Sequence, residues 1–501
     1  MATLSSRSVT MPSAQRGIAA VLAAAGSVPN VDPLAAFFVR ARRHFGEQFE
    51  PDALLAHWAS RSVGTLLGTD RYRWELTHKR GTGIPSYAGP PGTWQAWRAS
   101  EAGIVQRDAF VLEESLLGPI VNFESAELLA DSPASLGASA LLQEAEPVLR
   151  RDFAQYALER NAWADTFPAW CLSRYPATFC SLRSVLVAVV ETYAARARRR
   201  DGIVLGTRFP FHERPLVSAS AQLALSSLAL GCHFDVAAGA LAFVAAQRRE
   251  DGGWGDAVDP SDLLTTLVAL DLLSHFDPEF DPAPTAQFLE RRQRPDGFWR
   301  AFGPEAPWLT AMLVEQLQAL ELPFARRFRF PRAHPDNLDR KTRLPSFAYF
   351  AELSRLFNTM PGLAKAEVEL GFIDLIGFRA FNNRYGQAQG DEVLRLFAEG
   401  LSSSESVCSV RDGGDEFLLL GAPGGEPLDR VIGRIQHDWP ARFQASFGAE
   451  ASPVLARALV ARSRGATVLA AREDLGRAIG ELKTVECDPQ LGILRRIELG
   501  A

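Results

Sequence analysis

Two adjacent carboxylates, Asp415 and Glu416, follow a pair of glycines, Gly413 and Gly414, between two short apolar runs. Glycine has no Cβ atom, so this turn can be tight and a ligand can approach its backbone closely. The flanking apolar runs predict the two strands of a β-hairpin with the acids at its tip. Exposed acids are common in turns, so the motif alone leaves a plain solvated turn as the alternative.

A third carboxylate, Asp374, interrupts the apolar run 368–378, which has the composition of a buried central strand. A carboxylate in such a strand must be paired, protonated or bound to a metal ion. If the hairpin lies beside this strand, Asp374 and Asp415 form a site for a divalent cation. Mg²⁺ usually binds through one or two carboxylates and the phosphates of a substrate, so we expect Mg²⁺, with Mn²⁺ as an alternative.

The segment 381–401 follows this strand and combines polar groups with an amphipathic pattern. Gly386 and Gly390 predict a loop, and Asp391 is expected to begin a helix. Asp391 could serve only as the N-cap of that helix. Alternatively, Asn382 and Asp391 supply the hydrogen-bonding groups that would read the N1–H and amino edge of guanine.

With these motifs in place, residues 339–485 resemble a GGDEF domain, the catalytic domain of diguanylate cyclases. The signature is intact at 413–417. The segment from Asp374 matches the family pattern of Asp, then Phe-Lys-x-x-Asn-Asp-x-Tyr-Gly-His, then Gly-Asp-x-x-Leu. The segment 339–350 loosely matches the opening Asp-x-Leu-Thr-Gly-Leu-Pro-Asn-Arg. The resemblance implies an α+β, nucleotidyl-cyclase-like fold.

The resemblance also implies roles for individual residues. The metal ligands would be Asp374, Asp415 and the Leu375 carbonyl, and Glu416 would assist at the metal or deprotonate the attacking hydroxyl. The substrate-binding residues would be Asn382 and Asp391 for guanine, the Gly377 and Phe378 amides and Lys483 for the phosphates, and Gly413 and Gly414 at the turn. The implied reaction condenses two GTP molecules into cyclic di-GMP with release of pyrophosphate, and it requires a homodimer.

Several positions depart from the family pattern. Ile376 replaces a second Asp, Gln387 replaces His, Ser346-Phe347 replaces Asn-Arg, and Cys487 replaces an expected Arg. The inhibitory Arg-x-x-Asp product site would fall at residues 404–407, which read SESV, so this site is expected to be absent. An alternative function is therefore a catalytically degenerate domain that binds GTP in signalling without turnover.

The region before residue 325 predicts an all-α repeat. Helix pairs end in turns of the form Gln, then Asp-Gly, then Trp, around Trp254 and Trp299, with a period of about 45 residues, which is typical of helix-pair repeats. These turns resemble those of the α/α-toroid family of terpene cyclases and prenyltransferases, and another helical repeat is the alternative. No Asp-x-Asp-Asp acid motif occurs, which disfavours terpenoid chemistry. We expect a regulatory domain that binds a hydrophobic small ligand or a protein partner.

Length and composition limit the remaining choices. The chain has 501 residues, 59 acidic and 53 basic ones, and five scattered cysteines. These numbers predict several domains, no nucleic-acid partner, no disulfide framework and a cytoplasmic location without a membrane span. We expect a multidomain protein with a toroid-like domain at 1–325, a Pro- and Arg-rich linker at 326–338 and a GGDEF domain at 339–501.

Overall fold

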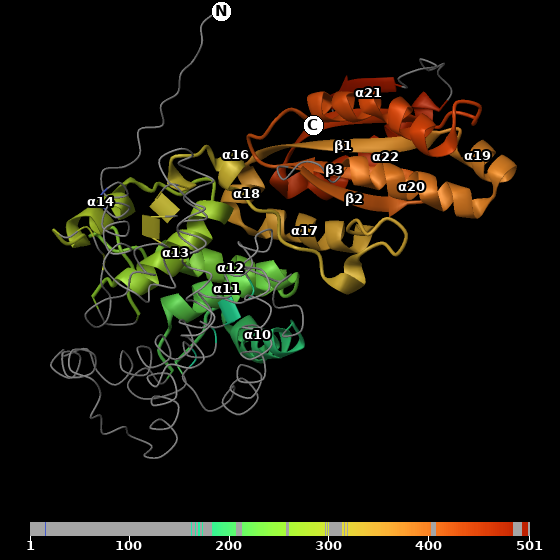
Figure 1. Cartoon of the computed structure of the whole chain (residues 1–501). Helices are drawn as coiled ribbons and strands as arrows, with labels where there is room; N and C mark the ends of the chain where they lie inside the picture. The colour runs from blue at the N-terminus through green and yellow to red at the C-terminus, as the bar shows by residue number, and fades with distance from the viewer. Residues whose placement is uncertain are drawn as a thin grey trace, which may run out of the picture. The chain divides into compact units, whose positions relative to one another are not determined.

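The chain divides into two compact units, residues 1–273 with 280–322, and residues 274–279 with 323–501. The computed structural model describes residues 183–206, 213–256, 260–295, 319–401, 407–483 and 493–498, with isolated positions at 16, 162, 166, 169, 170, 173, 297, 299, 313, 314, 316 and 317 (Figure 1). Most of the predicted toroid-like domain therefore lies outside the described residues. Residues 326–338, predicted as a linker, fall within the second unit.

The described part of the first unit is helical. It contains α10 (Arg183–Ala197), α11 (Val217–Leu230), α12 (Phe234–Ala246), α13 (Leu263–Phe276) and α14 (Ala283–Arg292), with the last three residues of α13 assigned to the second unit. The helices α11 and α12 are antiparallel neighbours in sequence and pack against each other. Small and apolar residues fill their contact, which agrees with the predicted helix pairs.

The predicted repeat turn is built twice with the same geometry. The indole Nε1 of Trp254 donates to the carbonyl of Val244 at 2.8 Å, and that of Trp299 donates to the carbonyl of Leu289 at 2.7 Å. The glycine two residues before each tryptophan has a φ of +89° or +85°. Each turn thus ties a buried indole to the end of the preceding helix. The toroid itself has no support in the described residues and stays a prediction.

The second unit is built on a five-stranded sheet with the order β2-β3-β1-β4-β5 (Figure 1). The strands are β1 (Glu367–Ile376), β2 (Val407–Gly413), β3 (Glu416–Gly421), β4 (Leu455–Arg464) and β5 (Ile493–Ile497). All neighbours are antiparallel except β4 and β5, which are parallel. The predicted central strand is therefore confirmed, because β1 lies between β3 and β4 and is almost wholly buried.

Helices cover both faces of this sheet. They are α16 (Phe324–Arg327), α17 (Phe347–Thr359), α18 (Pro361–Lys365), α19 (Phe378–Tyr385), α20 (Gln387–Leu401), α21 (Leu428–Phe447) and α22 (Val468–Leu482). Successive strand residues point to opposite faces. A Cβ on Gly371 would meet Ile432 of α21, whereas the next residue, Phe372, faces Gly476 of α22. The helices α20 and α21 therefore share one face, and α17 and α22 pack on the other.

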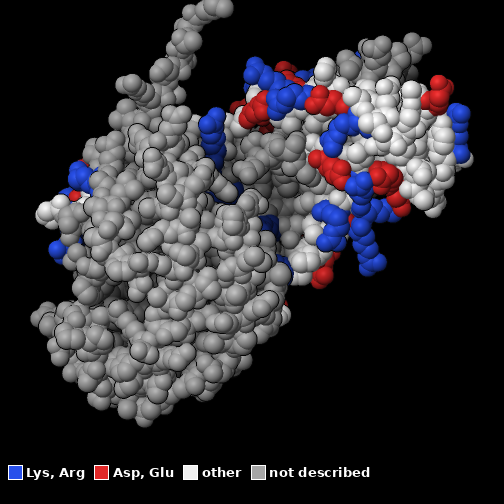
Figure 2. Space-filling model, viewed as in Figure 1, with Lys and Arg blue, Asp and Glu red and all other residues white. Residues whose placement is uncertain are grey.

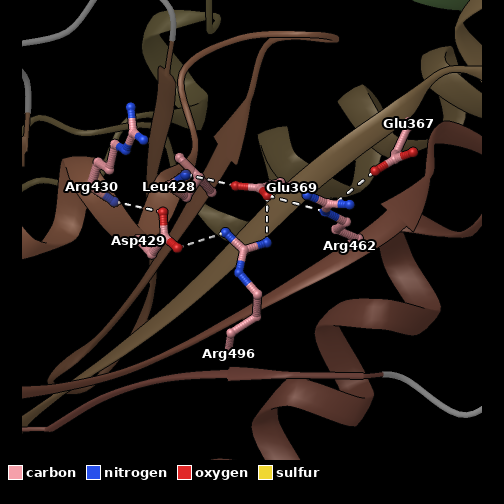
Figure 3. A network of polar contacts seen from close by, with 7 residues as sticks. All are labelled: Glu367, Glu369, Leu428, Asp429, Arg430, Arg462 and Arg496. Carbon is pink, nitrogen blue, oxygen red and sulfur yellow. Dashed lines mark hydrogen bonds and ion pairs between the residues drawn. The ribbon is translucent and has the colours of Figure 1, made fainter.

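An ion-pair network fixes the far end of β1, away from the hairpin tip (Figure 3). Glu369 of β1 accepts hydrogen bonds from Arg496 of β5 at 2.5 Å and from the Leu428 amide at the start of α21 at 2.6 Å. Arg496 also reaches Asp429 at 2.9 Å, and Arg462 of β4 lies 3.5 Å from Glu369. One carboxylate thus connects two strands and a helix.

The surface of the second unit carries both signs of charge. Figure 2 shows Lys and Arg side chains lying next to Asp and Glu side chains on its visible face. Among the described residues, no helix is long and apolar enough to cross a bilayer.

Candidate functional site

The predicted hairpin lies directly beside the strand that carries Asp374. In the register of β1 and β3, Asp374 is paired with Glu416, and the Leu375 amide donates to the Asp415 carbonyl at 3.2 Å. Because β3 is the immediate neighbour of β1, the hairpin tip is held against the end of the central strand. The sequence-based expectation that these segments meet is confirmed.

The turn of the hairpin consists of Gly414 and Asp415 between paired residues Gly413 and Glu416. Gly414 has a φ of +46°, a conformation that glycine adopts easily. A Cβ atom on Gly413 or Gly414 would meet no atom within 4 Å. Packing within the described chain therefore does not account for these glycines, which leave open space in front of the carboxylates.

A bulge just before the turn anchors the hairpin to the face of the sheet that α22 covers. The register of β2 against β3 shifts between Arg411 and Gly413, so Asp412 is left without a strand partner. Its carboxylate, whose side chain is 2% exposed, pairs with Arg472 of α22. The bulge thus turns one acid away from the turn, while Asp415 and Glu416 stay at the tip.

Two cations approach Asp374. The Asp374 side chain is only 5% exposed, with Oδ2 lying 2.9 Å from Arg457 Nε of β4 and Oδ1 3.5 Å from Lys483 Nζ. Lys483, at the end of α22, also lies 3.9 Å from Glu416 Oε1. Lys483 therefore lies beside the acids of β1 and the hairpin, and its contact with phosphates stays a prediction.

Burial and repulsion between carboxylates change the pKa values of the two acids of the hairpin. Desolvation raises the pKa of Asp415 above its ordinary value, and the nearby Asp374 carboxylate raises it further. Desolvation also raises the pKa of Glu416, although Lys483 opposes this effect. A cation placed among these groups would relieve the repulsion.

The donor set fits a divalent cation only in part. Asp374, Asp415 and Glu416 supply the hard oxygens that Mg²⁺ or Mn²⁺ prefers. Within the described residues, however, no group of three or more acidic, His or Cys side chains is arranged to hold a metal ion by itself. A metal ion here would need further oxygen ligands, as a nucleotide triphosphate would provide.

An open pocket of about 780 Å³ lies in front of the glycine turn. Its wall combines the turn with α19, α20 and the segment before α17. It is lined by Asp339, Lys341, Ser346, Phe347, Ala348, Phe378, Arg379, Asn382, Gln387, Asp391, Leu394, Arg411, Asp412, Gly413, Gly414 and Asp415. Of the predicted site residues, Asp374, Leu375, Gly377, Glu416 and Lys483 are not part of this lining.

Asn382 and Asp391 both line the pocket. The Asn382 Oδ1 atom is buried and accepts no hydrogen bond from the described residues. A Cβ on Gly390 would lie 1.6 Å from this atom, so only glycine leaves room for the amide there. Asn382 thus holds an unused acceptor at the pocket wall.

The expectation that Asp391 starts its helix is wrong. Helix α20 begins at Gln387, so Asp391 lies inside the helix and is not its N-cap. Gly386 alone, with a φ of +88°, makes the bend between α19 and α20. The second predicted loop glycine, Gly390, is helical and is needed for its contact with Asn382.

The first turn of α19 follows the end of β1. Gly377 is the N-cap, with a φ of +80°, and Phe378 is the first helical residue. The first amides of a helix have no partner within the helix, so they are suited to bind anions. Phe378 lines the pocket. This location is consistent with the predicted phosphate contacts of these two amides.

Four basic residues of the site were missed at the sequence level. Lys341, which stands at the leucine of the family's opening pattern, lies 2.7 Å from Asp391 Oδ1. Arg379 and Arg411 also line the pocket. Arg411 is 8% exposed, and its buried Nη1 atom makes no hydrogen bond with the described residues. The fourth is Arg457, an inward-facing arginine in the alternating run of β4.

The positions that depart from the family pattern are mostly at the site as well. Ser346, Phe347 and Gln387 line the pocket, and Ile376 is the last residue of β1. Phe347 is 37% exposed, and the guanidinium of Arg472 lies over its ring. Cys487 and residues 404–406 lie outside the described residues.

Comparison with known proteins gives the family of this unit. Residues 336–442 match the family model "Diguanylate cyclase, GGDEF domain". The second unit of the chain carries a GGDEF domain. This match lies within the second unit, so the family assignment applies to the C-terminal region.

Curated relatives agree with this assignment. The chain is 30% identical over 177 residues to the diguanylate cyclase DgcP of Escherichia coli, covering 33% of this chain and 49% of that protein. It is 35% identical over 114 residues to the diguanylate cyclase TpbB of Pseudomonas aeruginosa, covering 21% of this chain and 26% of that protein. The chain therefore spans about half or less of the length of these relatives.

A solved structure is also similar to part of the chain. The GGDEF domain of TpbB from P. aeruginosa is 28% identical, covers 32% of this chain and 93% of that one, and has a TM-score of 0.26.

Proposed function

We propose that the chain synthesises cyclic di-GMP from two molecules of GTP. The observation that carries this proposal is the pairing of Asp374 with Glu416 across β1 and β3, which holds these two acids next to Asp415. Asp415 lines a pocket that also contains polar groups suited to guanine. The family match and the diguanylate cyclases among the relatives give the reaction class.

In this proposal the pocket orients one GTP molecule. Asn382 and Asp391 bind the guanine edge, and the Gly377 and Phe378 amides with Lys483 bind the phosphates. Gly413 and Gly414 leave room for the ribose and triphosphate above the turn. Asp374, Asp415 and the Leu375 carbonyl would hold Mg²⁺ or Mn²⁺, which neutralises the triphosphate and stabilises the leaving pyrophosphate.

The hydroxyl that attacks comes from a second GTP. Glu416 has a raised pKa, which suits a group that accepts a proton from that hydroxyl. One domain holds one GTP, so two domains must face each other for the 3′-hydroxyl of one to reach the α-phosphorus of the other. A homodimer would therefore complete the active site, and its orientation supplies much of the rate.

The helical unit would regulate this reaction. Two chains could associate in more than one arrangement. A ligand or partner that binds one of these arrangements more tightly would shift the equilibrium toward it.

A second candidate function is GTP binding without turnover. The observation that favours it is the neutralisation of Asp374 by Arg457 and Lys483, which leaves less charge for a metal ion. Under this alternative, GTP would bind and change the partner contacts of the chain without forming a product.

Turnover of GTP discriminates between the two functions. The full chain is incubated with GTP and Mg²⁺ at several protein concentrations, and cyclic di-GMP and pyrophosphate are quantified. Synthesis with a rate per chain that rises with concentration supports a cyclase that works as a dimer. Asp415→Ala should lower the rate at least about 100-fold, because it removes charge stabilisation at the reacting phosphate. Asp438→Asn, at an exposed position of α21, is the matched control.

A wild-type chain that binds GTP but forms no product at any concentration would contradict the cyclase and support the binding function.

A further inference from the structure

We propose that Lys341 reads the O6 atom of guanine and, with Asp391, completes the recognition of the base. This inference rests on the proposed function, because it assumes that the pocket binds GTP. It assigns a specificity role to a residue of the segment before α17, at a position where the family's opening pattern has an apolar leucine.

The pair is formed inside the pocket. Lys341 Nζ lies 2.7 Å from Asp391 Oδ1, and both residues line the same cavity. Their side chains are 56% and 44% exposed, so solvent and a ligand can reach both. An exposed ion pair contributes little to folding stability, so stability alone gives this pair little reason to be here.

A small capped turn determines where Lys341 leaves the backbone. The Asp339 carboxylate accepts hydrogen bonds from the Lys341 amide at 3.2 Å and from the Thr342 amide and hydroxyl at 2.8 Å. The Asp339 amide in turn donates to the Leu344 carbonyl at 2.8 Å. The lysine is therefore presented by an ordered turn.

The chemistry of the pair matches guanine. An ammonium group has three donors, and one is used by Asp391. The Asp391 carboxylate has further lone pairs that can accept the N1–H and amino protons of guanine. In guanine, the O6 acceptor is on the carbon next to N1. If the Asp391 carboxylate accepts the N1–H, the Lys341 ammonium bound to that carboxylate therefore lies next to O6.

Adenine presents the opposite pattern. Its 6-amino group is a donor that would face the ammonium, and its N1 is an acceptor that would face the carboxylate. The Lys341–Asp391 pair would therefore disfavour adenine at two adjacent positions, because two donors meet at one and two acceptors at the other. Asn382, whose amide group can donate and accept hydrogen bonds, lines the same pocket.

Nucleotide binding tests the role of Lys341. We would measure the Kd of the full-length chain for 3′-deoxy-GTP and for its 6-thio analogue by calorimetry with Mg²⁺, because the missing 3′-hydroxyl prevents turnover. Sulfur is a weaker hydrogen-bond acceptor than oxygen, so the analogue alters the one atom that Lys341 should contact. Wild type should bind the oxygen nucleotide about tenfold more tightly than the sulfur one.

The variant Lys341→Met should bind 3′-deoxy-GTP about tenfold more weakly and should no longer distinguish the two nucleotides. Lys365→Met is the matched control, because this exposed lysine pairs with Glu279 and does not line the pocket. Both variants should unfold at the wild-type temperature.

Three results would overturn the inference. Unchanged or tighter binding of 3′-deoxy-GTP by Lys341→Met would show that the lysine only neutralises Asp391. If Lys341→Met lost the same factor of affinity for both nucleotides, the lysine would act through its charge in general and not through a contact with O6. A wild-type chain that binds neither nucleotide would contradict the proposed function itself, which distinguishes its failure from that of the lysine contact.

Discussion

Arg457 on β4 lies directly opposite Asp374 on β1 and places its Nε atom 2.9 Å from the carboxylate. The N–H is not aligned for a hydrogen bond with any acceptor in the described part of the chain, so the contact is an ion pair. Lys483 adds a second cation at 3.5 Å. The strand thus carries a permanent positive charge next to the most buried acid of the proposed metal site.

Replacing Arg457 by Ser should therefore strengthen the binding of a divalent cation. Without the guanidinium, Asp374 would offer its full charge, and we expect Mn²⁺ to bind the nucleotide-free chain about tenfold more tightly. Electron paramagnetic resonance of free Mn²⁺ measures this affinity directly. Arg464→Ser, at an exposed end of the same strand, is the control. Weaker Mn²⁺ binding by Arg457→Ser would mean that the arginine supports the site.

Gly390→Ala should displace the Asn382 amide from the pocket wall. The added Cβ would lie 1.6 Å from Asn382 Oδ1, so the side chain must move. We expect GTP affinity to fall about tenfold or more, with little change in helix content because alanine favours a helix. Gly433→Ala in α21, where a Cβ makes only an ordinary contact, is the control. Equal GTP affinities for both variants, measured by calorimetry, would show that Asn382 does not bind the base.

The features of the site that depend on residues close together in the sequence could be predicted. The strand around Asp374 is an unbroken apolar run, and the hairpin is marked by paired glycines between apolar segments, so both elements are found as expected. The repeat turns at Trp254 and Trp299 were also visible because the same residue types recur after about 45 positions.

The part that depends on tertiary contacts could not be predicted. Gly390 was interpreted as a loop residue, because glycine is a poor helix former; its reason for being in α20 is the close approach of Asn382, 8 positions earlier. Arg457 and Lys341 each pair with an acid far away in the sequence. No local spacing indicates such partners, so Arg457 and Lys341 were found only in the structure.

Replacing Arg472 by Met should loosen the hairpin formed by β2 and β3. The Asp412 side chain is 2% exposed and pairs with Arg472, so the variant leaves a buried carboxylate without this partner. We expect a loss of about 3 kcal/mol in the free energy of unfolding of this unit, which urea denaturation would detect. Arg477→Met on the same helix removes an exposed pair with Asp474 and should cost less than about 0.5 kcal/mol. Equal stability of both variants would show that the bulge does not depend on α22.

The network around Glu369 should make the stability of the sheet depend on pH. Burial alone would raise the pKa of Glu369, but hydrogen bonds from Arg496 and the Leu428 amide hold it below its ordinary value. A hydrogen bond from Arg496 likewise lowers the pKa of Asp429. Because both acids have lower pKa values when folded than when unfolded, their stabilisation is present above the unfolded values, about pH 4, and is lost as the pH falls through the folded values.

Arg496→Met should therefore lower the local free energy of opening by about 1–2 kcal/mol at pH 7, a value that allows for the partial exposure of the pair. Below pH 4 the loss should become progressively smaller. Hydrogen exchange of peptides covering β1 and β5, measured at pH 7 and between pH 3 and 4, reports the local free energy of opening. Arg495→Met, at the adjacent exposed position of β5, should show no such pH-dependent loss. If the cost of Arg496→Met were the same at both pH values, the arginine would stabilise β5 through packing of its side chain and not through the charge of Glu369 and Asp429.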